Sequence, residues 1–89
     1  MRKLDLTHDA LGFLKTLPPK QFRQVVSKAF ELMANPEPQD SKTLIGYDYR
    51  TADIGEYRIV YRFDRDFVYV ALIRKRNDSD IYKRLKRKL

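Results

Sequence analysis

The sequence predicts an α+β domain with an N-terminal strand, a helical hairpin, a three-stranded antiparallel meander and a C-terminal helix. Two observations favour this fold. Between residues 47 and 75, three runs rich in β-branched and aromatic residues are separated by short polar breaks, which is typical of consecutive hairpins. Two earlier segments carry apolar residues at helical spacing, and the sheet is the layer available to cover them. The 89 residues show no internal repeat or linker, which indicates one domain over residues 1–89.

The N-terminal segment predicts a short strand followed by a capped helix. Arg2–Leu6 can form an edge strand, and Thr7 is a suitable N-cap residue. Asp9 in the first turn would interact favourably with the helix dipole. The apolar residues that follow at helical spacing are Ala10, Phe13, Leu14 and Leu17.

Prolines separate this helix from a second one. Pro18-Pro19 ends the first helix and begins the next, because proline is tolerated in the first turn of a helix but not in its interior. Asn35-Pro36 closes the second helix. Its predicted apolar face consists of Phe22, Val25, Val26, Ala29, Leu32 and Met33.

The meander is predicted over Tyr47–Ile54, Tyr57–Phe63 and Phe67–Lys75, with turns at Gly55-Glu56 and residues 64–66. Alternation in the middle strand separates Arg58, with Val60 and Arg62, from a set of aromatic and aliphatic side chains. A cation in the middle of a central strand is costly to bury without a partner. Arg58 therefore requires a buried acidic partner or an anionic ligand.

Composition excludes several kinds of site. The chain has no cysteine and one histidine, which argues against disulfides, a thiolate or zinc centre and a cysteine nucleophile. His8 is interpreted as a surface or capping residue. No glycine-rich phosphate loop is present, and we expect neither a cofactor nor a metal. No apolar run is long enough to span a bilayer and no signal peptide is evident, so we expect a cytoplasmic protein.

The positive charge is concentrated at the C-terminal end. Residues 74–89 carry eight basic and two acidic side chains, which gives +6 of the formal net charge of +7. Such an end favours a polyanionic partner such as nucleic acid, or an acidic protein, although a solvated C-terminal helix would look the same. A cap at Asn77-Asp78-Ser79 predicts that this helix runs to Leu89.

The order of motifs resembles that of the RelE/ParE toxin superfamily, and within it the RelE-like mRNA interferases. The resemblance covers essentially the whole chain and is carried by LKTLPPK, KTLIGYDYR, GEYRIVYRF and VALIRKRNDSDIY. It implies the RelE-like, microbial RNase-like fold and a toxin of a type II toxin–antitoxin system. The implied activity is endoribonuclease cleavage of mRNA on the ribosome, without a metal, by attack of a 2′-hydroxyl on its adjacent phosphate.

The resemblance also implies a catalytic set of Arg50, Arg58, Arg76 and Tyr82. Arg58 and Arg76 would stabilise transition-state charge, Arg50 would position the phosphate, and Tyr82 would stack or transfer a proton. Structural alternatives stay open: Arg50 could pair with Asp48 or Asp53, and Tyr82 could pack between the last helix and the sheet.

Two positions depart from the family pattern. Ala52 replaces the second of two lysines in the strand that holds Arg50, and Asp78 replaces an arginine two positions after Arg76. Arginine is a poor proton acceptor, because a guanidinium is hardly ever deprotonated. The general base is therefore open between Tyr82 and a ribosomal group.

The implied partners are an acidic antitoxin, the ribosome and its mRNA, with operator DNA reached only through the antitoxin and no membrane. The residues expected to bind nucleic acid are Lys42, Arg74, Lys75, Lys83 and Lys86. Two alternatives remain: a gyrase-inhibiting ParE-like toxin, and a catalytically weak homologue that acts as an antitoxin-binding co-repressor.

Overall fold

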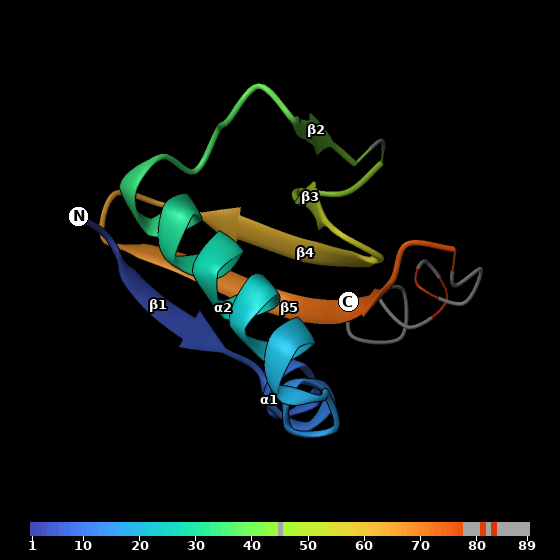
Figure 1. Ribbon diagram of the computed structural model, residues 1–89. Helices are drawn as coiled ribbons and strands as arrows, with labels where there is room; N and C mark the ends of the chain where they lie inside the picture. Colours follow the sequence, from blue (N-terminus) through green and yellow to red (C-terminus); the bar gives the residue numbers. More distant parts are fainter. Residues whose placement is uncertain (45, 78–80, 82, 84–89) are drawn as a thin grey trace.

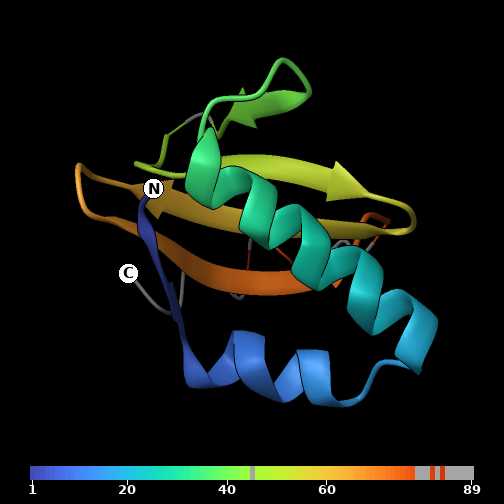
Figure 2. The same ribbon diagram turned by 60° about the vertical axis from the view of Figure 1, so that its left-hand side comes forward.

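A computed structural model shows two helices packed on one sheet (Figures 1 and 2), and it describes residues 1–44, 46–77, 81 and 83. In this part of the chain, five strands pair in the order β1-β5-β4-β3-β2. The elements are β1 (Lys3–Leu6), α1 (His8–Lys15), α2 (Pro19–Ala34), β2 (Ser41–Thr43), β3 (Arg50–Ile54), β4 (Tyr57–Phe63) and β5 (Phe67–Lys75). The predicted α+β class, N-terminal strand and helical hairpin are confirmed.

Strand β1 forms one edge of the sheet, where it runs parallel to the first half of β5. Thr7 then caps α1 as predicted, since its side-chain oxygen accepts a hydrogen bond from the Ala10 N–H at 3.1 Å. The same hydroxyl donates to the Ala71 carbonyl at 2.7 Å. One side chain therefore begins the helix and fixes it to β5.

Helix α2 begins at Pro19, as the proline pair predicts, and lies across one face of the sheet (Figure 2). Val25, Ala29 and Leu32 are buried on its inner side. Lys28 is also buried, and its Nζ donates to Asp40 Oδ2 at 2.7 Å. Burial opposes the charge on Lys28, but Asp40 and Glu31 outweigh it and raise the lysine pKa, while the hydrogen bond lowers the pKa of Asp40. This ion pair fastens the loop after α2 to the helix.

The predicted meander is confirmed as β3, β4 and β5, with two corrections. The first strand begins at Arg50 rather than Tyr47, because residues 46–48 form a turn and bend in front of it. Strand β2 was not predicted. It pairs antiparallel with β3, and Ser41 lies opposite Ala52. Gly55 occupies the first turn position of the β3–β4 hairpin with φ of +57°, a conformation that glycine adopts without steric cost.

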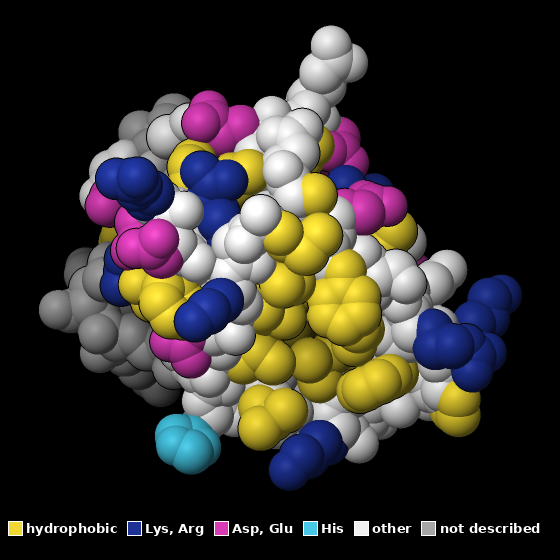
Figure 3. All heavy atoms as spheres, turned by 90° about the vertical axis from the view of Figure 1, so that its left-hand side faces the viewer, with side chains coloured by type: hydrophobic (Ala, Val, Ile, Leu, Met, Phe, Trp, Pro, Cys, Tyr) yellow, Lys and Arg dark blue, Asp and Glu magenta, His cyan; other side chains and the backbone are white. Residues whose placement is uncertain are grey.

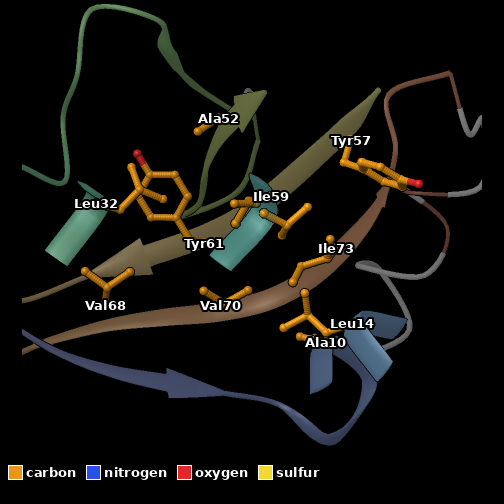
Figure 4. Close-up of a cluster of buried hydrophobic side chains, with 11 residues drawn as sticks. Ala10, Leu14, Leu32, Ala52, Tyr57, Ile59, Tyr61, Val68, Val70 and Ile73 are labelled. Carbon is orange, nitrogen blue, oxygen red and sulfur yellow. The ribbon is translucent and has the colours of Figure 1, made fainter. Parts of the chain in front are cut away.

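Hydrophobic side chains pack on both faces of the sheet. The cluster beneath the helices joins α1, α2 and the inner faces of the strands (Figure 4). Its fully buried members on β4 and β5 include Ile59, Tyr61, Val68 and Val70. On the outer face, a smaller cluster consists of Leu44, Val60, Ala71, Leu72 and Ile81, with Tyr47 and Tyr49 packed against it. Ile81 therefore brings the C-terminal segment onto the outer face.

The β4–β5 pairing contains an irregularity. Val60 pairs with Leu72, but the next residue, Tyr61, pairs with Val70, so Ala71 is an extra residue in β5. Because strand residues alternate between faces, the extra residue reverses the alternation of β5 beyond this point. Both Ala71 and Leu72 consequently belong to the outer cluster.

The predicted C-terminal helix lies almost wholly outside the described residues. None of the helices within the described residues has the length and hydrophobicity needed to span a bilayer.

Replacing Tyr61 with phenylalanine is expected to lower the free energy of unfolding by about 1–2 kcal/mol. The buried Tyr61 hydroxyl donates to the Pro36 carbonyl at 2.6 Å, and phenylalanine would leave that carbonyl without its donor. Urea unfolding would measure the loss. The matched control is Tyr69→Phe, since the Tyr69 hydroxyl bonds to Asp64 at an exposed site where water can replace it. Equal losses in the two variants would contradict the structural role of the Tyr61 bond.

Candidate nucleic-acid interface

Arg58 has the acidic partner that its mid-strand position requires. It faces Asp53 across the β3–β4 ladder, with Nε 2.8 Å from Oδ1 and Nη2 3.2 Å from Oδ2. This two-point contact fixes the plane of the guanidinium. Both side chains keep some exposure, 26% for Arg58 and 36% for Asp53. The structure therefore holds an oriented cation at the surface of the outer face.

A second arginine lies directly beside it. Arg58 pairs with Arg74 across β4 and β5, and like charges in that relation repel. Arg74 is balanced from the other side, since its Nη2 lies 2.9 Å from Asp9 Oδ1. The distance makes an ion pair, although the angle is not that of a hydrogen bond. The Arg74 guanidinium also lies 5.0 Å from the centre of the Phe13 ring, so α1 holds it in place.

Arg76 lies at the same end of the hairpin. Its backbone N–H donates to the Glu56 carbonyl at 2.7 Å, which ties the end of β5 to the β3–β4 turn. The exposed side chains of Lys75 and Arg76 line a hollow of about 260 Å³ together with Glu56 and Asn77. We call Arg58, Arg74, Lys75 and Arg76 the basic end of the sheet.

Arg50 does not belong to the basic end. It pairs with Tyr61 of β4, three residues before Asp53, so alternation places its side chain on the face opposite Arg58. Its Nη2 donates to Ser41 Oγ at 2.8 Å, its Nη1 donates to Thr43 Oγ1 at 3.2 Å, and Glu37 lies 3.9 Å away. Neither Asp48 nor Asp53 is its partner among these contacts. Its Nε is buried and has no hydrogen-bond acceptor in the described structure.

A comparison with protein families decides the identity of the chain. Residues 4–79 match the model of the ParE toxin of type II toxin–antitoxin systems, parDE. The chain belongs to this toxin family. The superfamily that the sequence resembles is thus confirmed, while no curated protein matches the chain in sequence.

Solved structures place this toxin beside RelE proteins. The free-state structure of a mutant Escherichia coli toxin RelE is 25% identical, with a TM-score of 0.81, and covers 99% of this chain and 98% of its own. The RelBE2 toxin–antitoxin complex of Mycobacterium tuberculosis is 29% identical, with a TM-score of 0.74 over 84% and 98% of the two chains. The intact E. coli RelBE complex is 25% identical, with a TM-score of 0.73 over 84% and 96%.

The remaining expected site residues of the toxin are dispersed. Tyr82 and Lys86 lie outside the described residues, as does Asp78. Lys42 and Lys83 are exposed, on β2 and in the C-terminal segment respectively. Ala52, where the resemblance places a second lysine, is only 1% exposed and packs in the cluster beneath the helices. A lysine there would have to bury its stem in the toxin core.

Sequence reasoning named Asp53 and Asp9 but did not identify them as the ion-pair partners of Arg58 and Arg74. The pairing of Asp53 with Arg58 could have been found, because a two-residue turn at Gly55-Glu56 places these residues opposite each other. The pairing of Asp9 with Arg74 joins a helix to a strand far along the chain, and no local pattern indicates it.

The toxin also exposes hydrophobic side chains on its helices. Phe22 and Phe30 of α2 are 40% and 56% exposed, and Leu11 of α1 is 39% exposed. Val26 lies between the two phenylalanines at helical spacing and is only partly buried. Hydrophobic side chains gather into a patch on the face shown in Figure 3. Contiguous exposed apolar surface of this kind is typical of a site where another protein binds.

Proposed function

We propose that this type II toxin is a ribosome-dependent endoribonuclease that cleaves mRNA during translation. The observation that carries the proposal is the convergence of Arg58 and Arg76 at one end of the β4–β5 hairpin, with Arg58 oriented by Asp53. The likeness to RelE structures at 25–29% identity supports it.

The proposed reaction is an attack of the ribose 2′-oxygen on the adjacent phosphorus, which releases the 5′-oxygen of the next nucleotide. The products are a 2′,3′-cyclic phosphate and a 5′-hydroxyl. The crowded phosphorane gains negative charge, and a cation that is already oriented stabilises that charge without having to reorganise. Arg58 has this property because Asp53 fixes its plane, and Arg76, which lines the hollow at the same end of the hairpin, supplies a second cation.

Proton transfer is assigned to Tyr82 or to a ribosomal group. Arg50 is unsuitable, because a guanidinium keeps its protons and its side chain lies on the opposite face from Arg58. We infer for Arg50 a role in positioning the strand or a remote phosphate, with Thr43 and Ser41 holding its side chain.

The alternative is a gyrase-inhibiting toxin without nuclease activity, and the ParE name of the matching family favours it. Transcript mapping after induction of the toxin separates the two. Cuts within translated codons, carrying 5′-hydroxyl ends, are expected for the nuclease. Intact messages accompanied by DNA damage would overturn the proposal in favour of the gyrase inhibitor.

The salt dependence of ribosome binding tests the role of the basic C-terminal tail, residues 74–89. If the tail neutralises about four phosphates of single-stranded RNA, the logarithm of affinity should fall against the logarithm of salt concentration with a slope of about −3. Replacing Lys83, Lys86 and Lys88 with glutamine should flatten that slope. An unchanged slope in a ribosome-binding titration would remove the tail from the docking surface. As a control, Lys15 and Lys20 of the helical hairpin are replaced with glutamine, and this change should leave the slope as it is.

We propose an acidic antitoxin as the partner of this toxin. Solved complexes of RelE with RelB support such a partner, and the +7 charge favours an acidic one. An amphipathic helix would cover the exposed side chains of Phe22 and Phe30 on α2. Operator DNA would be reached only through this antitoxin.

Co-expression with the neighbouring reading frames is expected to yield a stable complex from viable cells. The double replacement of Phe22 and Phe30 with serine should lower the antitoxin affinity at least about tenfold, because large apolar anchors dominate such interfaces. Lys15→Ser on α1 is the control. High yields of the toxin alone from unharmed cells would contradict an active toxin of this class.

A further inference from the structure

A second group of basic and aromatic side chains lies at the other end of the outer face. Arg62 of β4 pairs with Tyr69 of β5, and its guanidinium carbon lies 4.1 Å from the centre of the Tyr69 ring. The ring itself is held in place: it stacks on Phe67 at 5.4 Å, and its hydroxyl donates to Asp64 at 2.9 Å. Backbone N–H groups of Asp66 and Phe67, followed by this hydroxyl, lower the pKa of Asp64, so the anchor stays ionised.

Arg62 differs from the other arginines of the central strands. Arg58 and Arg74 each form an ion pair below 3 Å, and Arg50 lies within 4 Å of Glu37. Within the described part of the chain, Arg62 has no carboxylate at ion-pair distance and is exposed. Its positive charge and the side of its guanidinium away from Tyr69 are therefore accessible to a ligand.

Two neighbouring hollows meet at this arginine in the described structure. One, of about 280 Å³, is lined by Arg62, Tyr47, Tyr49, Arg50 and Asp48, among others. The other, of about 200 Å³, is lined by Arg62, Tyr49, Tyr69 and Asp5, among others. Arg62 and Tyr49 thus border both hollows, and aromatic and carboxylate side chains are among the residues that line them.

These groups match the chemistry of an unpaired nucleobase. Bases in single-stranded RNA stack on aromatic rings and on arginine guanidinium planes. Carboxylates such as Asp48 and Asp5 accept hydrogen bonds from the exocyclic amino groups of bases. A bare phosphate would be served by the charge of Arg62 alone and would have no use for the tyrosine walls.

We propose that the hollows beside Arg62, walled by Tyr49 and Tyr69, form a subsite that binds an unpaired RNA base, separate from the basic end. Arg58 and Arg62 lie four residues apart on one strand, which is about 13 Å. The outer hydrophobic cluster with Ile81 lies between them and keeps the two sites apart. The inference rests on the proposed function in taking RNA as the ligand, and the base belongs either to the message or to ribosomal RNA.

The test uses the purified toxin, a short unstructured oligoribonucleotide and an abasic oligomer of equal length and charge. Arg62→Lys keeps the charge but removes the planar group. We expect it to weaken binding of the oligoribonucleotide about 5- to 150-fold, the range measured for losing one base stack. Binding of the abasic oligomer should stay unchanged. Arg65→Lys, an exposed arginine in the adjacent turn, should change neither.

Arg62→Lys with wild-type affinity for the oligoribonucleotide would overturn the proposal, because charge alone would then explain the site. Equal weakening of both oligomers would also overturn it. On ribosomes, thiouridine cross-links to the peptide that contains Tyr69 identify the source of the base: an adduct with the message or with ribosomal RNA supports the proposal. The outcome of transcript mapping is independent of this binding test. Intact messages together with base-dependent binding at Arg62 would reject the proposed nuclease activity but support the subsite.

Discussion

Replacing Arg58 with alanine is expected to lower the rate of mRNA cleavage on ribosomes about 10²–10³-fold, the usual effect of losing one preorganised charge contact in a transition state. The reason is its geometry. Asp53 holds the guanidinium through two contacts, so its orientation is fixed before the substrate arrives. The measurement is the single-turnover cleavage rate of a ribosome-bound message, together with the binding affinity of the variant.

Two further variants separate catalysis from structure. Arg65→Ala removes the same charge from the exposed turn at the opposite end of the hairpin and should cleave at nearly the wild-type rate. Asp53→Asn keeps Arg58 but weakens its orientation, so we expect a loss smaller than that of Arg58→Ala. A folded Arg58→Ala protein that cleaves at the wild-type rate would show that the Arg58–Asp53 pair is structural and that the site lies elsewhere.

Replacing Leu32 with alanine is expected to lower the free energy of unfolding by about 2–5 kcal/mol. Leu32 is fully buried between α2 and the sheet, where it belongs to the main hydrophobic cluster (Figure 4). A domain of 89 residues has a total stability of only about 4–13 kcal/mol, so this single change removes a large share of it. Urea unfolding at constant m-value would measure the loss.

The control for this prediction makes the same substitution at an exposed helical site. Leu11 of α1 is 39% exposed, and Leu11→Ala should change the stability by no more than about 1 kcal/mol. Similar losses at Leu32 and Leu11 would mean that helix α2 is not held by the packing described above.

The predictable parts of the fold are those with local signals. Thr7 and the proline pair mark helix boundaries through hydrogen bonding and ring geometry, and both were identified from sequence. Strand β2 carries no such signal, because its three residues become a strand only by pairing with β3. Likewise, Tyr47 was assigned to a strand because it continues an aromatic run, but the chain turns there to place it against the outer cluster.

The candidate site was predictable in its residue types but not in its grouping. The resemblance selected Arg50 and Arg58 together, whereas the strand register places them on opposite faces. The contact of Arg74 with Asp9 depends on how α1 lies beside β5, which is a tertiary property. The stack of Arg62 on Tyr69 depends on the length of the turn at residues 64–66, which sets the pairing of the two strands.

Because Ala71 is an extra residue in β5, the alternation of its side chains between the two faces shifts by one residue at this point. Beyond it, Ile73 points into the core and Arg74 to the outside, whereas an uninterrupted strand would reverse the two. Deleting Ala71 itself would leave both side chains on their present faces, because Val70 and Leu72 would then alternate regularly. A one-residue insertion or deletion elsewhere in β5, without a second bulge, would instead turn the buried isoleucine outward and drive the arginine into the core. Chimeras of this toxin with relatives should therefore place any one-residue difference in the length of β5 at Ala71, since the same difference elsewhere would exchange the surface and the interior of the strand.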